Sequence, residues 1–321
     1  MNSTEVVLDE IREYYIVCSF TAVFFLIAMA ISLTILILVY KTKPRLHTVR
    51  HLLICNTAVA SILFCIVQTN NYMFLLFIPQ GTSDMSCRWR GYFAYLTLCG
   101  VLYSFLIQAI SRLFISLFSR QYRWLTTFRV HYLLIGIQWF VAIVLPLPAI
   151  VTMDIISRPY ALCFVPLRRM IHVAYTYIAY YTIPAILICI LYIFIYHRVK
   201  QMSNRAEIIV RSVNSNKRDL ELLRNIVILL SVYLMGGVPT LLFLFSGLRI
   251  LYLMGIVSIA FGVATEKVFT VLLDRELRQV VRQLRSKGTR IIPIDNSMTT
   301  GNYQINTVQT QRIFVQSTSK K

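Results

Sequence analysis

Seven apolar stretches, each about 21 to 26 residues long, account for most of this 321-residue chain. A helix of about 20 apolar residues is long enough to cross the hydrocarbon core of a bilayer. Hydrophobic residues make up 57% of the sequence and charged residues only 14%, against about 25% in soluble domains. Because backbone groups in hydrocarbon must be paired within the protein, the sequence predicts an all-α membrane protein, a seven-transmembrane helix bundle. The expected spans are residues 15–40, 49–72, 92–117, 130–153, 173–196, 225–245 and 251–273.

The basic residues give the chain a formal net charge of +19, and their distribution predicts the orientation of the spans. If the N-terminus is outside, 23 of the 32 lysines and arginines lie on the cytoplasmic side and seven on the outer side. Such a bias orients membrane proteins, so it explains the basicity without a nucleic-acid partner. The expected parts are an extracellular N-terminus (1–14), the bundle (15–273), a membrane-surface helix (274–287) and a disordered cytoplasmic tail (288–321). Asn2, in Asn2-Ser3-Thr4, is the expected glycosylation site.

Two of the seven cysteines differ in position from the rest. The other five fall inside the expected spans, where a thiol behaves as a small hydrophobic side chain. Cys87 precedes the third span and Cys163 lies between the fourth and fifth, both on the outer, oxidising side. A disulfide is favoured in that compartment, and the alternative is a pair of free thiols. The bridge would tie the second outer loop to the top of the third helix.

The segment after the last span has an amphipathic pattern. Leu277, Val280, Val281 and Leu284 recur at helical spacing, while arginines occupy the other faces. The pattern predicts a short eighth helix, 274–287, that lies along the inner leaflet with its apolar stripe inserted. The alternative is an ordinary solvated helix.

Several landmark residues occur together at family-specific spacings. Arg112 follows Cys87 by 25 residues, in Ser111-Arg112-Leu113. With these residues the chain resembles the rhodopsin-like (class A) family of G-protein-coupled receptors, from the first span to about residue 287. The resemblance implies a plasma-membrane receptor, without catalytic chemistry or a cofactor, that couples an extracellular ligand to a heterotrimeric G protein. Further matching landmarks are Trp139, Pro184, Tyr192 and Pro239.

The resemblance makes Arg112 the signalling arginine, which in the family is held by acidic residues at rest and contacts the G protein when active. Ser111 replaces the usual aspartate and offers only a neutral hydrogen bond. Asp219, 20 residues before Pro239, stands where the family often has a helix 6 acid. We therefore formulate a hypothesis in which Arg112 and Asp219 form an inactive-state latch. The alternatives are that Arg112 extends to lipid phosphates and that Asp219 balances neighbouring basic residues.

Helix 6 departs from the family pattern. Gly236-Gly237-Val238-Pro239 stands where the family has Cys-Trp-x-Pro, and Tyr233 occupies the position of a phenylalanine. The glycines either permit close helix packing or belong to a switch around Pro239.

Helix 7 departs further. Thr265-Glu266-Lys267-Val268-Phe269 replaces Asn-Pro-x-x-Tyr, and Ser61 and Ser32 replace the helix 2 aspartate and the helix 1 asparagine. The family's usual sodium site is therefore not expected. Glu266 and Lys267 either neutralise each other locally, or Glu266 supplies a replacement cation site while Lys267 extends to the cytoplasm.

The outer surface carries the ligand-binding candidates. Ala94 stands seven residues after Cys87, where amine receptors of the family have an aspartate, so amines are disfavoured. A peptide or small anion is weakly favoured, because basic side chains bind carboxylates and sulfates, and the alternative is a solvated basic loop. The basic candidates are Arg88, Arg90, Arg158, Arg168, Arg169 and His172.

The tail after residue 288 is polar and rich in serine and threonine, which is typical of disorder. Its phosphorylation would add negative charge and recruit an arrestin-like partner, or the tail is inert. Two other functional classes remain open for the whole chain, a membrane transporter or channel and a seven-helix protein that does not couple. A transporter would usually show charges near the bilayer midplane and paired broken helices.

Overall fold

A computed structural model describes residues 3–42, 48–77, 83–115, 122–156, 162–166, 169–205, 236–243 and 245–288. Every regular element in these ranges is helical. Residues 1–282 form one compact unit and residues 283–321 a second one. The labelled helices are α1 (Ser3–Lys41), α2 (Val49–Phe77), α3 (Asp84–Leu113), η2 (Arg123–Thr126), α4 (Phe128–Val144), α5 (Leu147–Val151), α6 (Met170–Tyr177), η3 (Ile178–Thr182), α7 (Ile183–Arg205), α9 (Arg249–Leu273) and α10 (Arg275–Gly288).

Six helices among the described residues are long and apolar enough to cross a membrane. They are α1, α2, α3, α4 with α5, the continuous helix α6–η3–α7, and α9. The predicted sixth span, 225–245, lies largely outside the described residues, although 236–243 are helical. The all-helical membrane architecture is thus confirmed, with six of the seven expected spans described.

Two helices extend well beyond the apolar runs that predicted them. α1 begins at Ser3, and α3 begins at Asp84, where the Ser83 hydroxyl caps the first turn by accepting the Ser86 amide. Hydropathy identifies the part of a helix that lies in hydrocarbon, whereas capping residues and acidic first turns decide where the helix itself starts. Residues 3–14, expected as an extracellular segment, are therefore part of the first helix.

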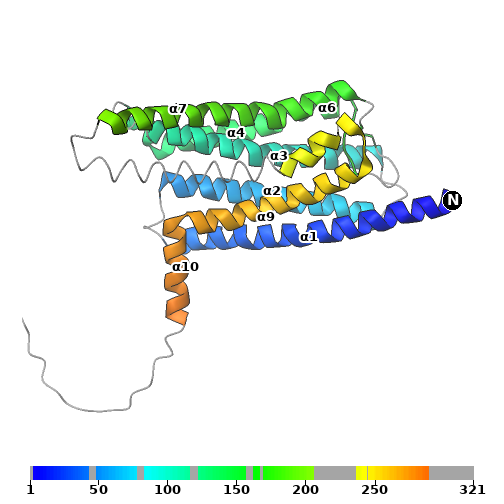
Figure 1. The fold of residues 1–321 in the computed structure, drawn as a ribbon, viewed down its shortest axis with the longest axis horizontal. Coiled ribbons are helices and arrows are strands. Elements are labelled where there is room, and N and C mark those ends of the chain that lie inside the picture. Colours follow the sequence, from blue (N-terminus) through cyan, green and yellow to red (C-terminus); the bar gives the residue numbers. More distant parts are fainter. Residues whose placement is uncertain are drawn as a thin grey trace, which may run out of the picture. The chain divides into compact units, whose positions relative to one another are not determined.

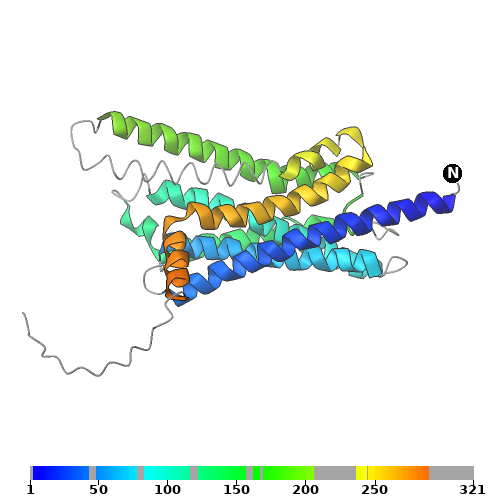
Figure 2. The same ribbon diagram turned by 60° about the horizontal axis from the view of Figure 1, so that its bottom comes forward.

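The long helices of residues 1–282 lie side by side, as Figure 1 and Figure 2 show from two directions. α1 packs against α2 and α9, and α3 packs against α2, α4 and α7. The core between them is rich in aromatic side chains, including an edge-to-face pair, Phe25 and Phe64, with ring centroids 5.8 Å apart. A polar network links three helices, because the Gln138 amide bonds both Asn56 (2.6 Å) and the Gly100 carbonyl (2.8 Å).

The fifth span contains a turn of π-helix, η3, directly before Pro184. A proline has no N–H for the carbonyl four residues earlier, so the helix widens where the ladder is interrupted. The Tyr103 hydroxyl of α3 donates to the Ala179 carbonyl within this turn, at 2.9 Å. The proline thus places a widened, hydrogen-bonded turn in the outer half of the span.

α10 starts at an acidic cap. The Asp274 carboxylate accepts the backbone N–H groups of Glu276 and Leu277, and it pairs with Arg50 of α2 at 2.9 Å. Leu277 and Val280 are buried in a cluster with Leu38 of α1. This part of the expected membrane-facing stripe is directed to the bundle instead, because α1 lies within reach of its first two turns. Val281 stays exposed, and the side chain of Leu284 lies outside the described part of the chain.

Candidate functional site

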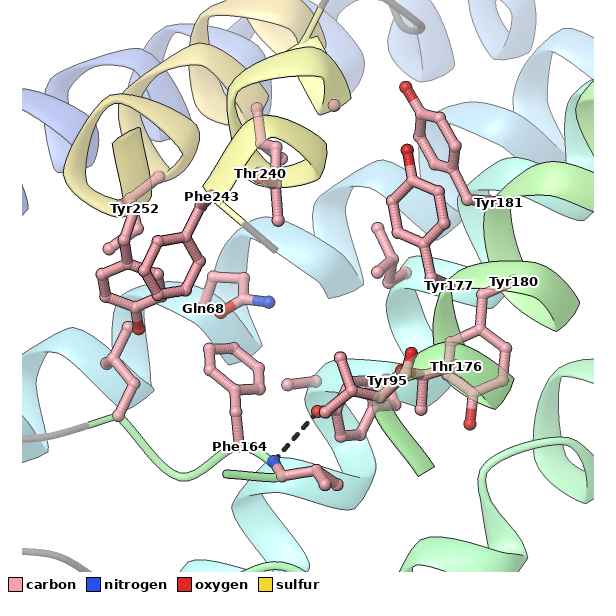
Figure 3. A pocket seen from close by; sticks show the side chains of 18 of the residues that line it. Gln68, Tyr95, Phe164, Thr176, Tyr177, Tyr180, Tyr181, Thr240, Phe243 and Tyr252 are labelled. Atoms are coloured by element: carbon pink, nitrogen blue, oxygen red, sulfur yellow. Dashed lines mark hydrogen bonds between the residues drawn. The ribbon is translucent and has the colours of Figure 1, made fainter. Parts of the chain in front are cut away.

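A cavity of about 610 Å³ lies between the long helices at the end of the bundle that carries the disulfide. Its described wall comes from α1, α2, α3, the loop after Cys163, the α6–η3–α7 helix, residues 236–243 and α9. Figure 3 shows its aromatic side chains around a central space. The aromatic wall residues are Tyr14, Phe25, Phe64, Tyr72, Tyr95, Phe164, Tyr177, Tyr180, Tyr181, Phe243 and Tyr252.

A disulfide-anchored loop forms one side of this cavity. Cys87 and Cys163 are bonded, with their sulfur atoms 2.08 Å apart, which confirms the predicted pairing. Phe164 and Val165 follow in the wall, and the Val165 amide donates to the Tyr95 hydroxyl at 3.1 Å (Figure 3). Gly91 permits this approach, because a Cβ there would lie 2.5 Å from the Cys163 carbonyl oxygen. The loop is thus fixed to α3 at several points.

The predicted outer binding residues do not come together at the cavity. Ala94 is in its wall and is 1% exposed. Arg90 instead lies over the Phe74 ring, 4.0 Å from its centroid, and Arg169 and His172 are directed to Asp154. None of these three basic residues belongs to the described wall, and Arg168 lies outside the described residues.

The Asp154 carboxylate is contacted by two basic side chains of this outer region. His172 Nδ1 lies 2.9 Å from one of its oxygens and Arg169 Nε 3.4 Å from the other. The Thr152 hydroxyl donates to the same carboxylate at 2.7 Å, and this bond, together with the basic neighbours, holds the pKa of Asp154 below its ordinary value. Two of the basic residues that favoured an anionic ligand are therefore already paired with a carboxylate.

Arg112 lies at the opposite end of α3, within electrostatic range of Tyr192 on α7. Tyr192 is 5% exposed, and its hydroxyl finds no hydrogen-bond partner among the described atoms. Ser111 contacts His131 of α4 at 2.8 Å, and His131 Nδ1 lies 2.9 Å from the Thr127 carbonyl, which can only accept. His131 Nδ1 therefore donates to the Thr127 carbonyl, and the contact of Ser111 with Nε2 links α3 to α4.

Some of the predicted switch residues cannot be placed. Asp219, the proposed latch partner of Arg112, lies outside the described residues, as do Tyr233 and Asn2. The latch and the glycosylation site therefore stay predictions.

The two glycines before Pro239 lie in close contact with neighbouring helices. The Ser258 hydroxyl of α9 donates to the Gly236 carbonyl at 2.7 Å. A Cβ on Gly237 would overlap the Tyr181 hydroxyl of η3. These contacts support the close-packing interpretation of the glycines, with Pro239 in the helical segment 236–243.

A buried ion pair lies on α9. Lys267 is 1% exposed and its Nζ lies 2.8 Å from Glu266 Oε2, while Thr270 donates to the other carboxylate oxygen at 3.0 Å. Local neutralisation of the two charges is thus confirmed, and the alternative, in which Lys267 extends to the cytoplasm, is wrong. Its ammonium turns inward to within 3.5 Å of the Thr57 carbonyl, beside the Gln108 amide, which donates to the Thr57 hydroxyl at 2.6 Å. Gln108 was missed, although a polar residue within a span is itself a signal.

Sequence comparison agrees with this geometry. Residues 31–249 match the family described as 7 transmembrane receptor (rhodopsin family), about two thirds of the chain. That stretch holds the disulfide, Arg112 and most of the cavity wall. No individual curated protein matches the sequence. The chain belongs to the rhodopsin family of seven-transmembrane receptors.

Proposed function

We propose that this receptor binds an extracellular ligand in the aromatic cavity and converts that binding into activation of a heterotrimeric G protein. The observation that carries the proposal is that one helix, α3, contributes both to the cavity wall and to the signalling end of the bundle. Ala94, Tyr95, Leu98 and Leu102 contribute to the cavity wall, and Arg112 follows ten residues after the last of them. At 1.5 Å per residue, about 15 Å of rigid helix separate the cavity from the signalling arginine.

The helix α6–η3–α7 offers a second connection between the two ends. Tyr177, Tyr180 and Tyr181 belong to the cavity wall, and Tyr192 further along the same helix lies near Arg112. The π-turn joins them, and such turns are frequent at functional sites because the helix there is easily rearranged. A ligand that separates the tyrosines from α3 would shift α7, and with it the Tyr192 hydroxyl, relative to Arg112.

The proposal includes a plasma-membrane orientation with the N-terminus outside and the C-terminus in the cytoplasm. The lysine and arginine bias supports it, and so does the disulfide, because an oxidising outer compartment stabilises the Cys87–Cys163 bond. Phosphorylation of the tail would recruit an arrestin-like protein on the cytoplasmic side. Glycosylation of Asn2 would mark the outer side.

The function is tested in cells that express the receptor with a promiscuous G protein. A panel of peptides, small anions and neutral amides is screened for G-protein activation in the wild type, in Arg112→Ala and in the control Arg129→Ala. Arg129 is an exposed basic residue in the first turn of α4. We expect a response that is lost in Arg112→Ala and kept in Arg129→Ala. An unchanged response in Arg112→Ala, at equal surface expression, contradicts the proposed coupling.

One observation favours a second candidate, an ion-conducting or transport function. The Glu266–Lys267 pair places two charges inside a span, where ionisable residues often mark an ion path. Proteoliposome flux measurements distinguish the two functions. Ion flux that depends on Glu266, without any G-protein activation, would favour the transporter over the receptor.

A further inference from the structure

A side-chain amide with an unpaired carbonyl oxygen, among the described atoms, lies in the wall of the aromatic cavity. Gln68 of α2 is 6% exposed, and its side-chain carbonyl oxygen has no hydrogen-bond partner among the described atoms. Figure 3 shows its amide between Phe243 and Tyr252 on one side and the tyrosines of α6 and η3 on the other. Buried polar groups are nearly always paired in folded proteins, so an unpaired one on a side chain that lines a cavity indicates a ligand or water there.

A second buried amide lies one helical turn further along α2. Asn71 lies one helical turn after Gln68 on the same face of α2. It is 4% exposed, and neither its carbonyl oxygen nor its NH₂ group is paired within the described part of the chain. It is not a wall residue of the cavity. The outer half of α2 thus presents a buried polar position with both donor and acceptor capacity.

Three hydroxyl groups of the wall already have hydrogen-bond partners. Thr176 donates to the Val173 carbonyl at 2.8 Å, and Tyr180 donates to the Leu145 carbonyl at 3.2 Å. The Tyr95 hydroxyl accepts the Val165 amide. Among the described wall residues, Gln68 is the one with a buried side-chain N or O atom that lacks a hydrogen-bond partner.

The wall offers little to balance a charged ligand. Arg249 is the one charged side chain in its described part, and it lies 3.6 Å from Glu13 and over the Tyr14 ring. An ion that enters an apolar site loses its hydration, which is unfavourable unless an opposite charge replaces the water. An uncharged ligand avoids this cost.

The aromatic residues indicate the shape of the ligand. Phe243 and Tyr252 form a ring pair with centroids 5.2 Å apart, and Tyr177 and Tyr181 form another at 5.4 Å. Flat rings bind well against such faces by offset or edge contacts. A carboxamide suits this site, because it donates an N–H to the Gln68 carbonyl oxygen while it stays uncharged. A carboxylate only accepts, so it cannot satisfy this oxygen, and an ammonium donates but brings a charge that the wall does not balance.

We propose that the cavity binds an uncharged, flat aromatic molecule that carries a carboxamide, with this amide hydrogen-bonded to Gln68. The proposal rests on the receptor function above and specifies its ligand class. It replaces the expected anion with a neutral compound, because the unpaired group of the wall is a carbonyl oxygen, which an anion cannot satisfy.

Three probes with one ring system and different charges test this class. They are anthracene-2-carboxamide, anthracene-2-carboxylate and 2-(aminomethyl)anthracene, whose fluorescence reports binding to full-length receptor in lipid nanodiscs without a G protein. Empty nanodiscs give the membrane background. We expect the amide to bind at least about tenfold more tightly than either ion, because the ions leave their hydration uncompensated. Tighter binding of the carboxylate or the ammonium, or equal binding of all three, overturns the proposal.

A matched pair of variants then tests Gln68 itself. Gln68→Leu removes the cavity amide, whereas Asn70→Leu removes an exposed amide from the same helix, outside the cavity wall. We expect Gln68→Leu to weaken amide binding by about tenfold, the effect of one lost buried hydrogen bond, and Asn70→Leu to leave it unchanged. Unchanged binding in a folded Gln68→Leu receptor overturns the role of Gln68.

The probe ranking in the wild type needs no variant, so it stays decisive if Gln68→Leu does not fold. Because no G protein is present, failure of the ligand class is separate from failure of coupling. The receptor function is contradicted separately, by the response of Arg112→Ala in the G-protein assay.

Discussion

The buried Glu266–Lys267 pair gives the most quantitative prediction. Its side chains are 3% and 2% exposed, and the charged atoms lie 2.8 Å apart. Neighbouring residues on a helix point about 100° apart, so both side chains must bend toward each other to form this contact. Each charged group has one further contact. The Thr270 hydroxyl donates to the carboxylate, and the ammonium lies near the Thr57 carbonyl.

The two single variants should be far more harmful than the double variant. At 2.8 Å and an effective dielectric constant of about 20, the attraction is about 6 kcal/mol, which the desolvation of both ions largely offsets. Glu266→Gln leaves the buried ammonium unpaired, and Lys267→Met does the same to the carboxylate. Each should lower the free energy of unfolding by about 3–5 kcal/mol. Glu266→Gln/Lys267→Met removes both charges and should lie within about 1 kcal/mol of the wild type or above it.

Thermal unfolding of purified receptor in nanodiscs measures the effect. The single variants should unfold on the order of 10 °C below the wild type, and the double variant near it. Glu13→Gln is the control, because it breaks the half-exposed pair with Arg249 and should change stability by less than about 1 kcal/mol. Single variants as stable as the control, or losses that simply add in the double variant, would refute the buried-pair reasoning.

Three further predictions concern the outer region and helix 6. Cys163→Ser should lower the free energy of unfolding by about 2–5 kcal/mol, and adding Cys87→Ser should lower it little further, because the bond is already lost. If thermal unfolding shows that the losses of the two single variants add up in the double variant, the result argues against the bridge. The lowered pKa of Asp154 stabilises the folded state above its unfolded pKa of about 3.9. The excess melting temperature of the wild type over Asp154→Asn should therefore shrink as the pH falls from about 5 to about 3. An excess that stays constant or grows over that range would contradict this sign. Gly237→Ala should lower the free energy of unfolding by about 1–3 kcal/mol, because the added methyl group overlaps Tyr181. Tyr181→Ala in the same chain should restore part of this loss. Equal stability of Gly237→Ala and the wild type would exclude the close contact.

Features that depend on sequence-local physics could be predicted from the sequence. The membrane spans follow from runs of apolar residues, and the Cys87–Cys163 bond from two cysteines in an oxidising compartment. Pro184 indicates where the fifth span is interrupted, although the π-turn itself depends on how the freed carbonyl groups are satisfied.

Features that depend on side-chain direction could not be predicted. Lys267 lies near the end of its apolar run, where an extended side chain reaches water, but α9 turns it toward α2 instead. Gln68 belongs to the polar run Gln68-Thr69-Asn70-Asn71, and the sequence gives no reason to choose which of these side chains faces the interior. The outer basic residues were expected to bind a ligand together, yet Asp154, distant from His172 in sequence, pairs with two of them.

The central claim is that occupation of the outer cavity reaches the G protein through the arginine at the far end of α3. It is tested most directly by guanine-nucleotide exchange on a purified heterotrimer, with receptor in nanodiscs and the most active compound of the panel. The account predicts exchange above the receptor-free rate for the wild type and for Arg129→Ala, and the receptor-free rate for Arg112→Ala. Wild-type exchange by a folded Arg112→Ala receptor would contradict it.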